Sequence, residues 1–290
     1  MGTLLSDLRY GFRMLTKNPG FTAVAVLTLA LGMGATTTIF SVVDAVLLRP
    51  LPYKDSAQLV VMREKTHRVG DVSVSYPDFL DWRQQSRVFA GMAAAHNVGF
   101  NLGGITQPES IGGYAVSPNF LSLLGVRPIL GRDFLPAEET AGTAPVALLS
   151  YRLWQSHFAS DSRVMGREIT LDGRDYAVVG VLPASFRFLQ DTDVLTPIGV
   201  FAKDLMERGD RGDMDVVGRL APGATFAQAG AEMDTIAARL ARQYPRDDTG
   251  VGVSMVTIRD SFVGDSRQEP DARRSPYPER RPARGTDWPR

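Results

Sequence analysis

The carboxylates whose spacing could support acid–base chemistry are Asp78 and Asp81. Two carboxylates three positions apart on a helix could share a proton between a general acid and a general base. They follow Ser75 and Pro77, residues typical of a helix start, where the positive end of the helix favours negative side chains. We therefore interpret this pair as part of a helix N-terminus, with catalysis as the alternative.

A second group of carboxylates, Asp210, Asp213 and Asp215, alternates with Arg208 and Arg211 in the segment ERGDRGDMD. Calcium binding would need oxygen ligands at EF-hand spacing and a bidentate glutamate, and this segment has neither. We therefore expect a solvated loop in which the arginines pair with the neighbouring carboxylates. The segment also contains Arg-Gly-Asp twice, which we interpret as coincidence in a chain rich in these residues.

Motifs of known catalytic or cofactor chemistry are absent from the sequence. There is no P-loop GxxxxGK[ST], no GxSxG and no HExxH. The three histidines, His67, His96 and His157, lack the spacing of metal ligands, and we interpret them as surface or packing residues. We predict no catalytic, cofactor-binding or metal-ligating residues, no cofactor and no enzymatic activity.

The composition excludes several classes of protein. The 290 residues include 32 Lys or Arg and 32 Asp or Glu, so the balanced charge gives no sign of a nucleic-acid partner. Hydrophobic residues make up 44% of the chain, which excludes a wholly disordered protein. The chain has no cysteine, and this excludes disulfides, thiol catalysis and cysteine-ligated metals.

The N-terminal region carries the sequence pattern of a membrane anchor. No charged residue occurs from residue 18 to residue 43, and apolar residues continue to residue 48. About 20 apolar residues are enough to cross a bilayer, so we predict a transmembrane helix over 18–48. The alternative is a signal peptide cleaved near Gly34 or Ala35. We favour an uncleaved anchor, because the apolar stretch continues well beyond that point.

The leader, residues 1–17, predicts an amphipathic helix on the cytoplasmic membrane surface. Its large apolar residues fall on one helical face: Leu4, Leu5, Leu8, Phe12 and Leu15. Arg9, Arg13 and Lys17 lie close to the membrane edge, and basic residues favour the cytoplasmic side. We therefore place the N-terminus in the cytoplasm and the chain from Arg49 onward outside.

Residues 49–265 predict a mixed α+β domain, folded as two lobes, since strand and helix patterns alternate. Thr225 and Gln228 form a capping-box pattern, and Asp172-Gly173 is typical of a tight hairpin turn. The predicted strands cover 58–62, 146–149, 168–171, 176–181, 216–220 and 251–258. The predicted helices begin at Ser75, Pro118, Tyr151 and Thr225, the second ending at Gly125 and the last at Pro245.

Several segments together resemble one family, the MacB/FtsX-type ABC transporter permeases, and in particular the acidobacterial-type permeases with a MacB-like periplasmic core domain. The segments that carry the resemblance are DLRYGFRMLTKNPGFT (7–22), SYPDFLDWR (75–83), VSPNFLSLLGVRPILGRDF (116–134), LSYRLWQSHF (149–158), GREITLDGRDYAVVGVLPASFRF (166–188) and RLAPGATFAQAGAEMDTIAARLA (219–241).

The resemblance implies a homodimeric permease in the bacterial inner membrane. One membrane helix would lead into a two-lobed periplasmic core, and three more membrane helices would follow it. A separate ABC ATPase subunit would bind the ATP. We therefore expect a permease subunit of an export system, with no catalysis of its own. The alternative is a membrane-anchored periplasmic interaction or sensor module that works without an ATPase.

The sequence departs from this family pattern after the core. No second apolar span follows residue 48, so we expect a truncated permease. Residues 266–290 are rich in arginine and proline and lack a periodic apolar face, which predicts a disordered tail. We interpret the abrupt change as a frameshift. The alternative is a genuine tail that binds anionic lipid headgroups.

Overall fold

The computed structural model describes residues 17, 19–43, 53–104, 109–189 and 192–262, and the chain divides into two units, Met1–Pro50 and Leu51–Arg290. Most of the predicted leader and all of the predicted tail lie outside the described residues.

The N-terminal unit contains helix α2, Pro19–Val43. Lys17 is also helical, and Asn18, where the Asn-Pro-Gly sequence predicts a break, lies outside the described residues. The hydroxyls of Thr28 and Thr36 each donate to the carbonyl four residues earlier, at 2.8 Å, so these polar groups are satisfied within the helix. By length and hydropathy, no helix within the described residues qualifies as a membrane span. The helix is confirmed over 19–43, and the span predicted over 18–48 is not.

Among its described residues, the second unit contains four complete α-helices, four short 3-10 helices, eleven strands and a helical segment at 258–262. The α-helices are α3 (Tyr76–Gln85), α4 (Phe120–Leu124), α5 (Tyr151–Phe158) and α6 (Phe226–Gln243). The 3-10 helices are η2 (Ser56–Gln58), η3 (Pro136–Glu139), η4 (Ser162–Val164) and η5 (Ile198–Val200). The strands are β1 (Leu59–Thr66), β2 (Gly70–Val72), β3 (Phe89–Leu102), β4 (Glu109–Val116), β5 (Leu130–Gly131), β6 (Val146–Leu149), β7 (Glu168–Leu171), β8 (Arg174–Val181), β9 (Val194–Pro197), β10 (Met214–Leu220) and β11 (Val251–Thr257).

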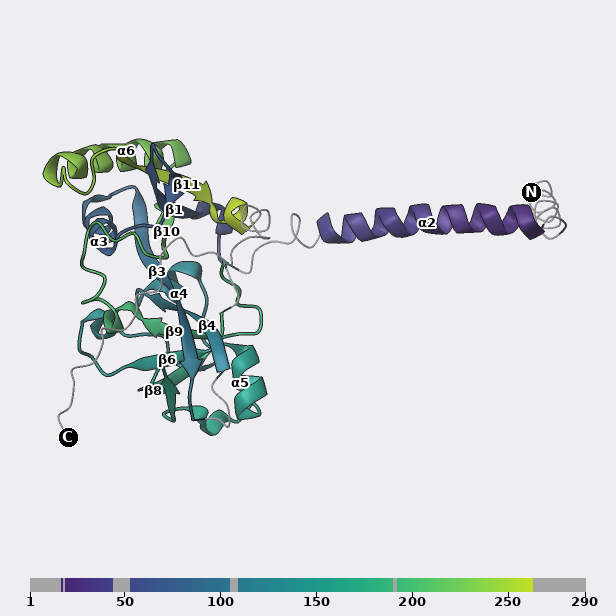
Figure 1. Ribbon diagram of the computed structural model, residues 1–290, viewed down its shortest axis with the longest axis horizontal. Helices are drawn as coiled ribbons and strands as arrows, with labels where there is room; N and C mark the ends of the chain where they lie inside the picture. The colour runs from purple at the N-terminus through teal and green to yellow at the C-terminus, as the bar shows by residue number, and fades with distance from the viewer. Residues whose placement is uncertain (1–16, 18, 44–52, 105–108, 190–191, 263–290) are drawn as a thin grey trace, which may run out of the picture. The chain divides into compact units, whose positions relative to one another are not determined.

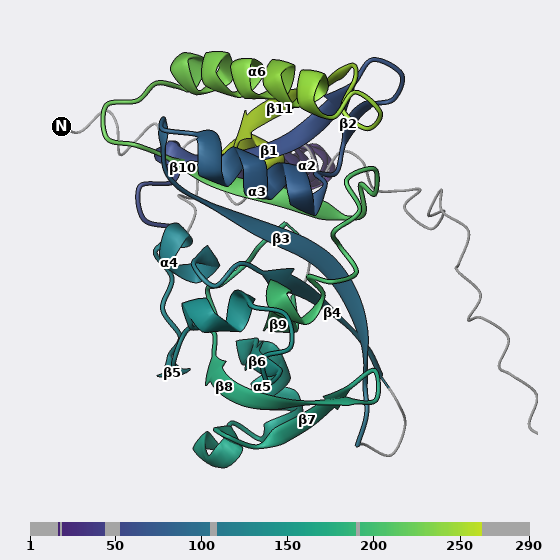
Figure 2. The same cartoon turned by 90° about the vertical axis from the view of Figure 1, so that its left-hand side faces the viewer.

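All eleven strands belong to one mixed sheet, in the order β11-β1-β10-β3-β4-β9-β6-β8-β5, with β2 and β7 beside this path. The pairs β4–β9 and β6–β8 are parallel and the other pairs are antiparallel. The fourteen-residue strand β3 pairs with β10 through its first half and with β4 through its second. Strand β3 runs between two parts of this unit (Figure 1 and Figure 2). The first part carries α3 and α6, and the second carries α5, β7 and β8. The predicted α+β class is confirmed, and one sheet joins the two parts.

The strands at the centre of the first part are buried on both faces. In β1, Val60 and Met62 pack beneath α3 and α6, whereas Leu59 and Val61 pack on the opposite face with α4. A third core lies around α5 and the β7–β8 hairpin. Burial on both faces explains why β1 has a continuous apolar run where a half-exposed strand would alternate.

Local signals in the sequence fix the ends of several elements. Ser75 caps α3, Gly125 ends α4 with a φ of 74°, and Ser150 caps α5. Asp172 and Gly173 both have positive φ in the tight β7–β8 turn. The predicted start at Ser75, the end at Gly125 and the Asp172-Gly173 turn are confirmed. The helix predicted from Pro118 begins two residues later, at Phe120. The last predicted strand is one residue too long, because Ile258 begins a helical turn that continues to Phe262.

The capping box at the start of α6 leads to a stability prediction. The Gln228 backbone N–H donates to the Thr225 hydroxyl at 3.2 Å, and the Thr225 backbone N–H donates to the Gln228 side chain at 2.9 Å. Thr225→Ala should lower the free energy of unfolding by about 1 kcal/mol, because a helix N–H loses its acceptor. Urea unfolding of the full chain in detergent, followed by tryptophan fluorescence, measures the change.

Thr235→Ala is the matched control, because Thr235 lies within the same helix and its exposed hydroxyl donates only to the Ala231 carbonyl. It should be neutral or slightly stabilising, since alanine has the higher helix propensity. Equal losses from the two substitutions would contradict the capping role.

Candidate functional site: a buried arginine–carboxylate cluster

The largest group of buried charges centres on two arginines in the segment that precedes β10. Its members come from four parts of the chain and are Glu64, Asp78, Asp81, Arg208, Arg211 and Asp248. We call these six residues the arginine–carboxylate cluster.

Arg208 binds both carboxylates of α3. Its Nη1 donates to Asp78, its Nη2 donates to Asp81 Oδ2 at 2.6 Å, and Asp248 Oδ2 lies 3.5 Å from Nη1. The guanidinium also lies over the ring of Tyr244, with Cζ 3.6 Å from the ring centroid. A cation above an aromatic face and beside carboxylates is held in one orientation.

Arg211 joins β1 to the loop that follows α6. Its Nε donates to Glu64, and its Nη2 donates to Asp248 Oδ1 at 3.2 Å and to the Asp247 carbonyl at 3.1 Å. Glu64 also accepts the Ser75 backbone N–H at 2.9 Å. Through these bonds the cluster ties together β1, the start of α3, the loop before β10 and the loop before β11.

Three of the four carboxylates are nearly inaccessible to solvent, since Glu64, Asp78 and Asp248 are 0%, 2% and 3% exposed. Four carboxylates against two guanidinium groups would leave an excess of negative charge if all were ionised. Burial raises the pKa of Glu64 to about 8, although Arg211 opposes this, and the Asp78 charge adds to the rise. Burial and Asp78 also raise the pKa of Asp248, to about 6. The cluster therefore retains a proton near neutral pH.

The cluster has no room for a substrate. The cavity beside it, lined by Trp82 and Leu240 among others, has a volume of about 10 Å³, which is close to the space of one water molecule. Within the described ranges, no three His, Asp or Glu side chains are arranged to hold a metal ion. What this geometry can do is hold four elements together and respond to protonation.

The expectation of a self-paired loop at 207–215 is wrong for both arginines. Arg208 and Arg211 pair with carboxylates from other elements, and Asp215 pairs with Arg63 at 2.6 Å. The reason is burial, because side chains that are only 13% and 15% exposed lie among carboxylates of the core and not in solvent. Asp78 does lie in the first turn of α3 as predicted, but its pairing with Arg208 was missed.

The histidines lie apart from the cluster. His157 Nε2 is 2.8 Å from Glu109 Oε2, and its Nδ1 is 2.8 Å from the Ser156 hydroxyl. His96 is on β3 with its ring edge toward Phe201, and burial lowers its pKa. His67 lies in the turn between β1 and β2.

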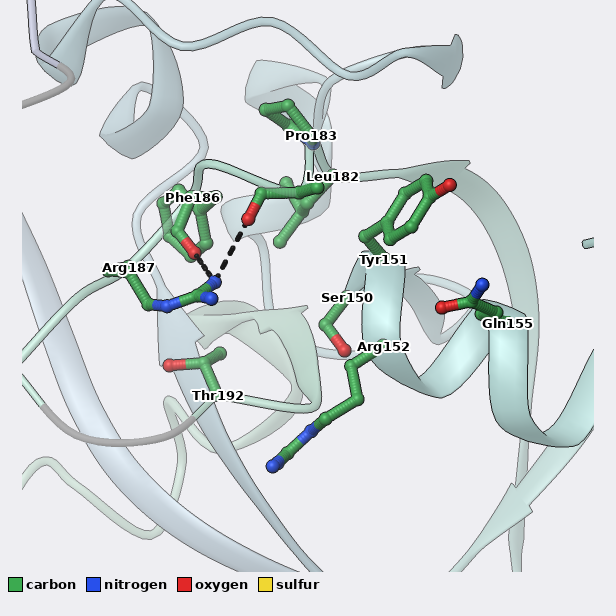
Figure 3. Close-up of a pocket in the computed structure, with 10 residues that line it drawn as sticks. Ser150, Tyr151, Arg152, Gln155, Leu182, Pro183, Phe186, Arg187 and Thr192 are labelled. Atoms are coloured by element: carbon green, nitrogen blue, oxygen red, sulfur yellow. Dashed lines mark hydrogen bonds between the residues drawn. The ribbon is translucent and has the colours of Figure 1, made fainter.

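A second concave feature lies at the start of α5 (Figure 3). This cleft of about 210 Å³ is lined by Ser150, Tyr151, Arg152, Gln155, Leu182, Pro183, Ala184, Phe186, Arg187 and Thr192. Arg152 is paired with Asp193 at 2.8 Å, and Arg187 donates to the carbonyls of Phe186 and Ala184 at 2.8 and 3.0 Å. The Ser150 hydroxyl accepts the Leu153 N–H as a helix cap. The Ser150 hydroxyl at this cleft is thus part of a helix cap.

The fold is shared with extracytoplasmic domains of ABC-type transporters. The periplasmic region of MacB from Actinobacillus actinomycetemcomitans aligns with a TM-score of 0.54 at 12% identity, covering 73% of this chain and 94% of that one. The extracellular domain of the noncanonic ABC-type transporter YknZ from Gram-positive bacteria aligns with a TM-score of 0.52 at 12% identity, covering 68% and 99%. A permease-protein domain from Porphyromonas gingivalis aligns with a TM-score of 0.54 at 15% identity, covering 71% and 92%.

Residues 22–236 match the MacB-like periplasmic core domain. The chain therefore belongs to the MacB-like periplasmic core domain family, and the predicted resemblance is confirmed. Comparison with curated protein sequences gives no match.

The raised pKa of Glu64 predicts that stability depends on pH. The folded state holds a proton on Glu64 up to about pH 8, whereas the ordinary pKa of this group is 4.5. A group with a raised folded pKa stabilises the protein at low pH and loses that contribution as pH rises through the folded value. Between pH 7 and 8, above most of the range in which Asp248 titrates, the free energy of unfolding should fall by up to about 1.4 kcal/mol per pH unit.

Glu64→Gln should flatten this slope, because glutamine is neutral at every pH. The control is Glu207→Gln, which replaces an exposed carboxylate beside the cluster and should leave the slope in place. Urea unfolding of the full chain at half-unit pH steps measures both. Equal slopes for Glu64→Gln and the unsubstituted chain would contradict the proton assignment.

Proposed function

We propose that this chain is a permease component of an ABC-type export system. The single observation that carries the proposal is membership of the MacB-like periplasmic core domain family over residues 22–236. In this role the domain formed by residues 51–262 contacts partners or transmits conformational change on the outer side of the membrane. A separate ATPase subunit supplies the energy, and the permease works as a homodimer.

The continuous sheet supports a mechanical role for the domain. Strand β3 pairs with β10 at residues 89–96 and with β4 at residues 95–102, so the same strand belongs to both parts of the sheet. Only residues 95 and 96 of β3 pair with both β10 and β4, so the two parts of the sheet meet within this one strand. A displacement of β10 would reach β4 and β9 through β3.

Co-isolation from native membranes tests the permease proposal. The chain, tagged at the N-terminus and expressed from its own locus, should recover an ATPase subunit with a P-loop, and the recovered complex should hydrolyse ATP. The control is an unrelated tagged protein with one membrane helix. Recovery of the chain with other partners but without any ATPase would contradict the permease proposal and favour an interaction or sensor module.

We also propose that residues 18–48 anchor the chain in the inner membrane, with the N-terminus in the cytoplasm and the core in the periplasm. The support is the uncharged sequence from residue 18 to residue 43, its helical conformation from Pro19 to Val43, and the basic residues before it. Residues 44–48 lie outside the described residues.

Reporter fusions test this topology. Alkaline phosphatase joined after Val61 should be active, because it would fold in the periplasm, and phosphatase joined after Lys17 should be inactive. Immunoblots of both fusions control for their amounts. A mature chain that begins near Thr36 would contradict the uncleaved anchor.

A further inference from the structure

The strand at one end of the sheet has an open hydrogen-bonding edge. Strand β11 is the last strand of the sheet path, and all seven of its residues pair with β1 on its other side without a register shift. Within the part of the chain that the structure describes, no strand pairs with the outer edge of β11. A free edge is a template for a further strand, because its N–H and C=O groups remain available.

The sequence of this edge lacks the features that usually block strand addition. Sheet edges are commonly protected by lysine, proline, a bulge or an inward-pointing charge. The strand reads VGVSMVT and contains none of them. Val256 is 38% exposed on this strand. The edge is therefore suited to pairing rather than protected from it.

Gly252 is a second observation that points to a partner. Glycine within a strand lowers stability and often marks a place where another backbone or side chain approaches closely. Among the described residues, a Cβ at Gly252 would meet only the Lys65 carbonyl oxygen, at 3.9 Å, so they leave room for a side chain there. Packing against the described residues does not explain the glycine.

We infer that the outer edge of β11 pairs with β11 of a second copy of this chain, antiparallel and centred on Ser254. A two-fold axis between identical strands makes the pairing antiparallel. In this register Val256 lies opposite Gly252 of the second copy, and Val253 lies opposite Met255. Residues 252, 254 and 256 point to one face of the strand, so each exposed valine fills the space that the facing glycine leaves.

An uncharged strand also favours a second copy over a charged partner. Side chains at opposite positions would be Val with Thr, Gly with Val, and Val with Met, and none of these pairs places like charges together. This pairing rests on the homodimer of the proposed function and identifies the surface through which the two copies meet. Its test uses the chain without any ATPase, so it can fail while the permease role holds.

A cysteine cross-link tests the pairing directly, because the chain contains no native cysteine. In the inferred register the two Ser254 Cβ atoms lie about 4.5–5.5 Å apart, close to disulfide distance. Ser254→Cys, in the full chain expressed alone in membranes and mildly oxidised, should form a cross-linked dimer. Mass spectrometry should find only this chain in the product.

The control is Val69→Cys, which places a thiol at a more exposed site, 77% exposed in the β1–β2 turn. It should yield little dimer. Equal dimer from the two positions would show random collision and overturn the inference. A Ser254→Cys adduct that contains a different protein would overturn the second-copy assignment.

Val256→Lys separates assembly from folding. Val256 is 38% exposed on the edge strand, so lysine at this position should leave the melting temperature of the folded domain unchanged. Lysine on a sheet edge opposes strand addition, so Val256→Lys should strongly reduce the Ser254→Cys cross-link. An undiminished cross-link at an unchanged melting temperature would overturn the pairing. If the chain recovers an ATPase but its Ser254→Cys variant does not cross-link, the permease role is upheld and only this interface is rejected.

Discussion

Burial of carboxylates beside two arginines is the interaction on which the rest of this structure depends, because it carries a large desolvation cost. Removing an ionised group from water costs several kcal/mol, and the cost is offset only while the partner charges and hydrogen bonds remain in place. Glu64 depends on Arg211 and on the Ser75 N–H, and Asp78 depends on Arg208. Each pair joins elements distant in sequence. The cluster is therefore complete only when β1, α3 and the loop before β10 are in their native positions.

The retained proton is part of this balance. With Glu64 neutral, the two guanidinium groups face three carboxylates instead of four, and the unfavourable excess of negative charge is smaller. The cluster with one proton is therefore more stable than a cluster with all four carboxylates ionised would be.

The sequence predicts those elements whose ends carry local signals. Thr225 with Gln228, Ser75 with Pro77, and Asp172 with Gly173 act through hydrogen bonds or backbone conformations within a few residues, so their patterns are visible in a single chain. The prediction missed β3 and β4, because their alanines and glycines pack against neighbouring strands and show no alternation. Their strand conformation comes from pairing with β10 and β9, which the sequence alone does not encode locally.

The arginine–carboxylate cluster escaped prediction for the same reason. Arg208 is separated from Asp78 by 130 residues, and no periodicity or spacing links them. The nearest sequence signal is the charged pair at Arg63 and Glu64, which interrupts an apolar strand. A charge inside such a strand indicates either an edge or a buried partner, and only the fold distinguishes the two.

The cluster and the open sheet edge share one structural element. The Val251 N–H, at the first residue of β11, donates to the Asp248 carbonyl at 3.1 Å, and the Asp248 side chain accepts from Arg211. Arg211 also holds Glu64, which pairs with Val253 near the same end of the β1–β11 pairing. The residue that fixes the start of β11 is thus itself fixed by the buried charges. Any rearrangement of the cluster that displaced Asp248 would move the first residue of the edge strand, so the charges of the core help to determine the shape of the surface that a second copy would meet.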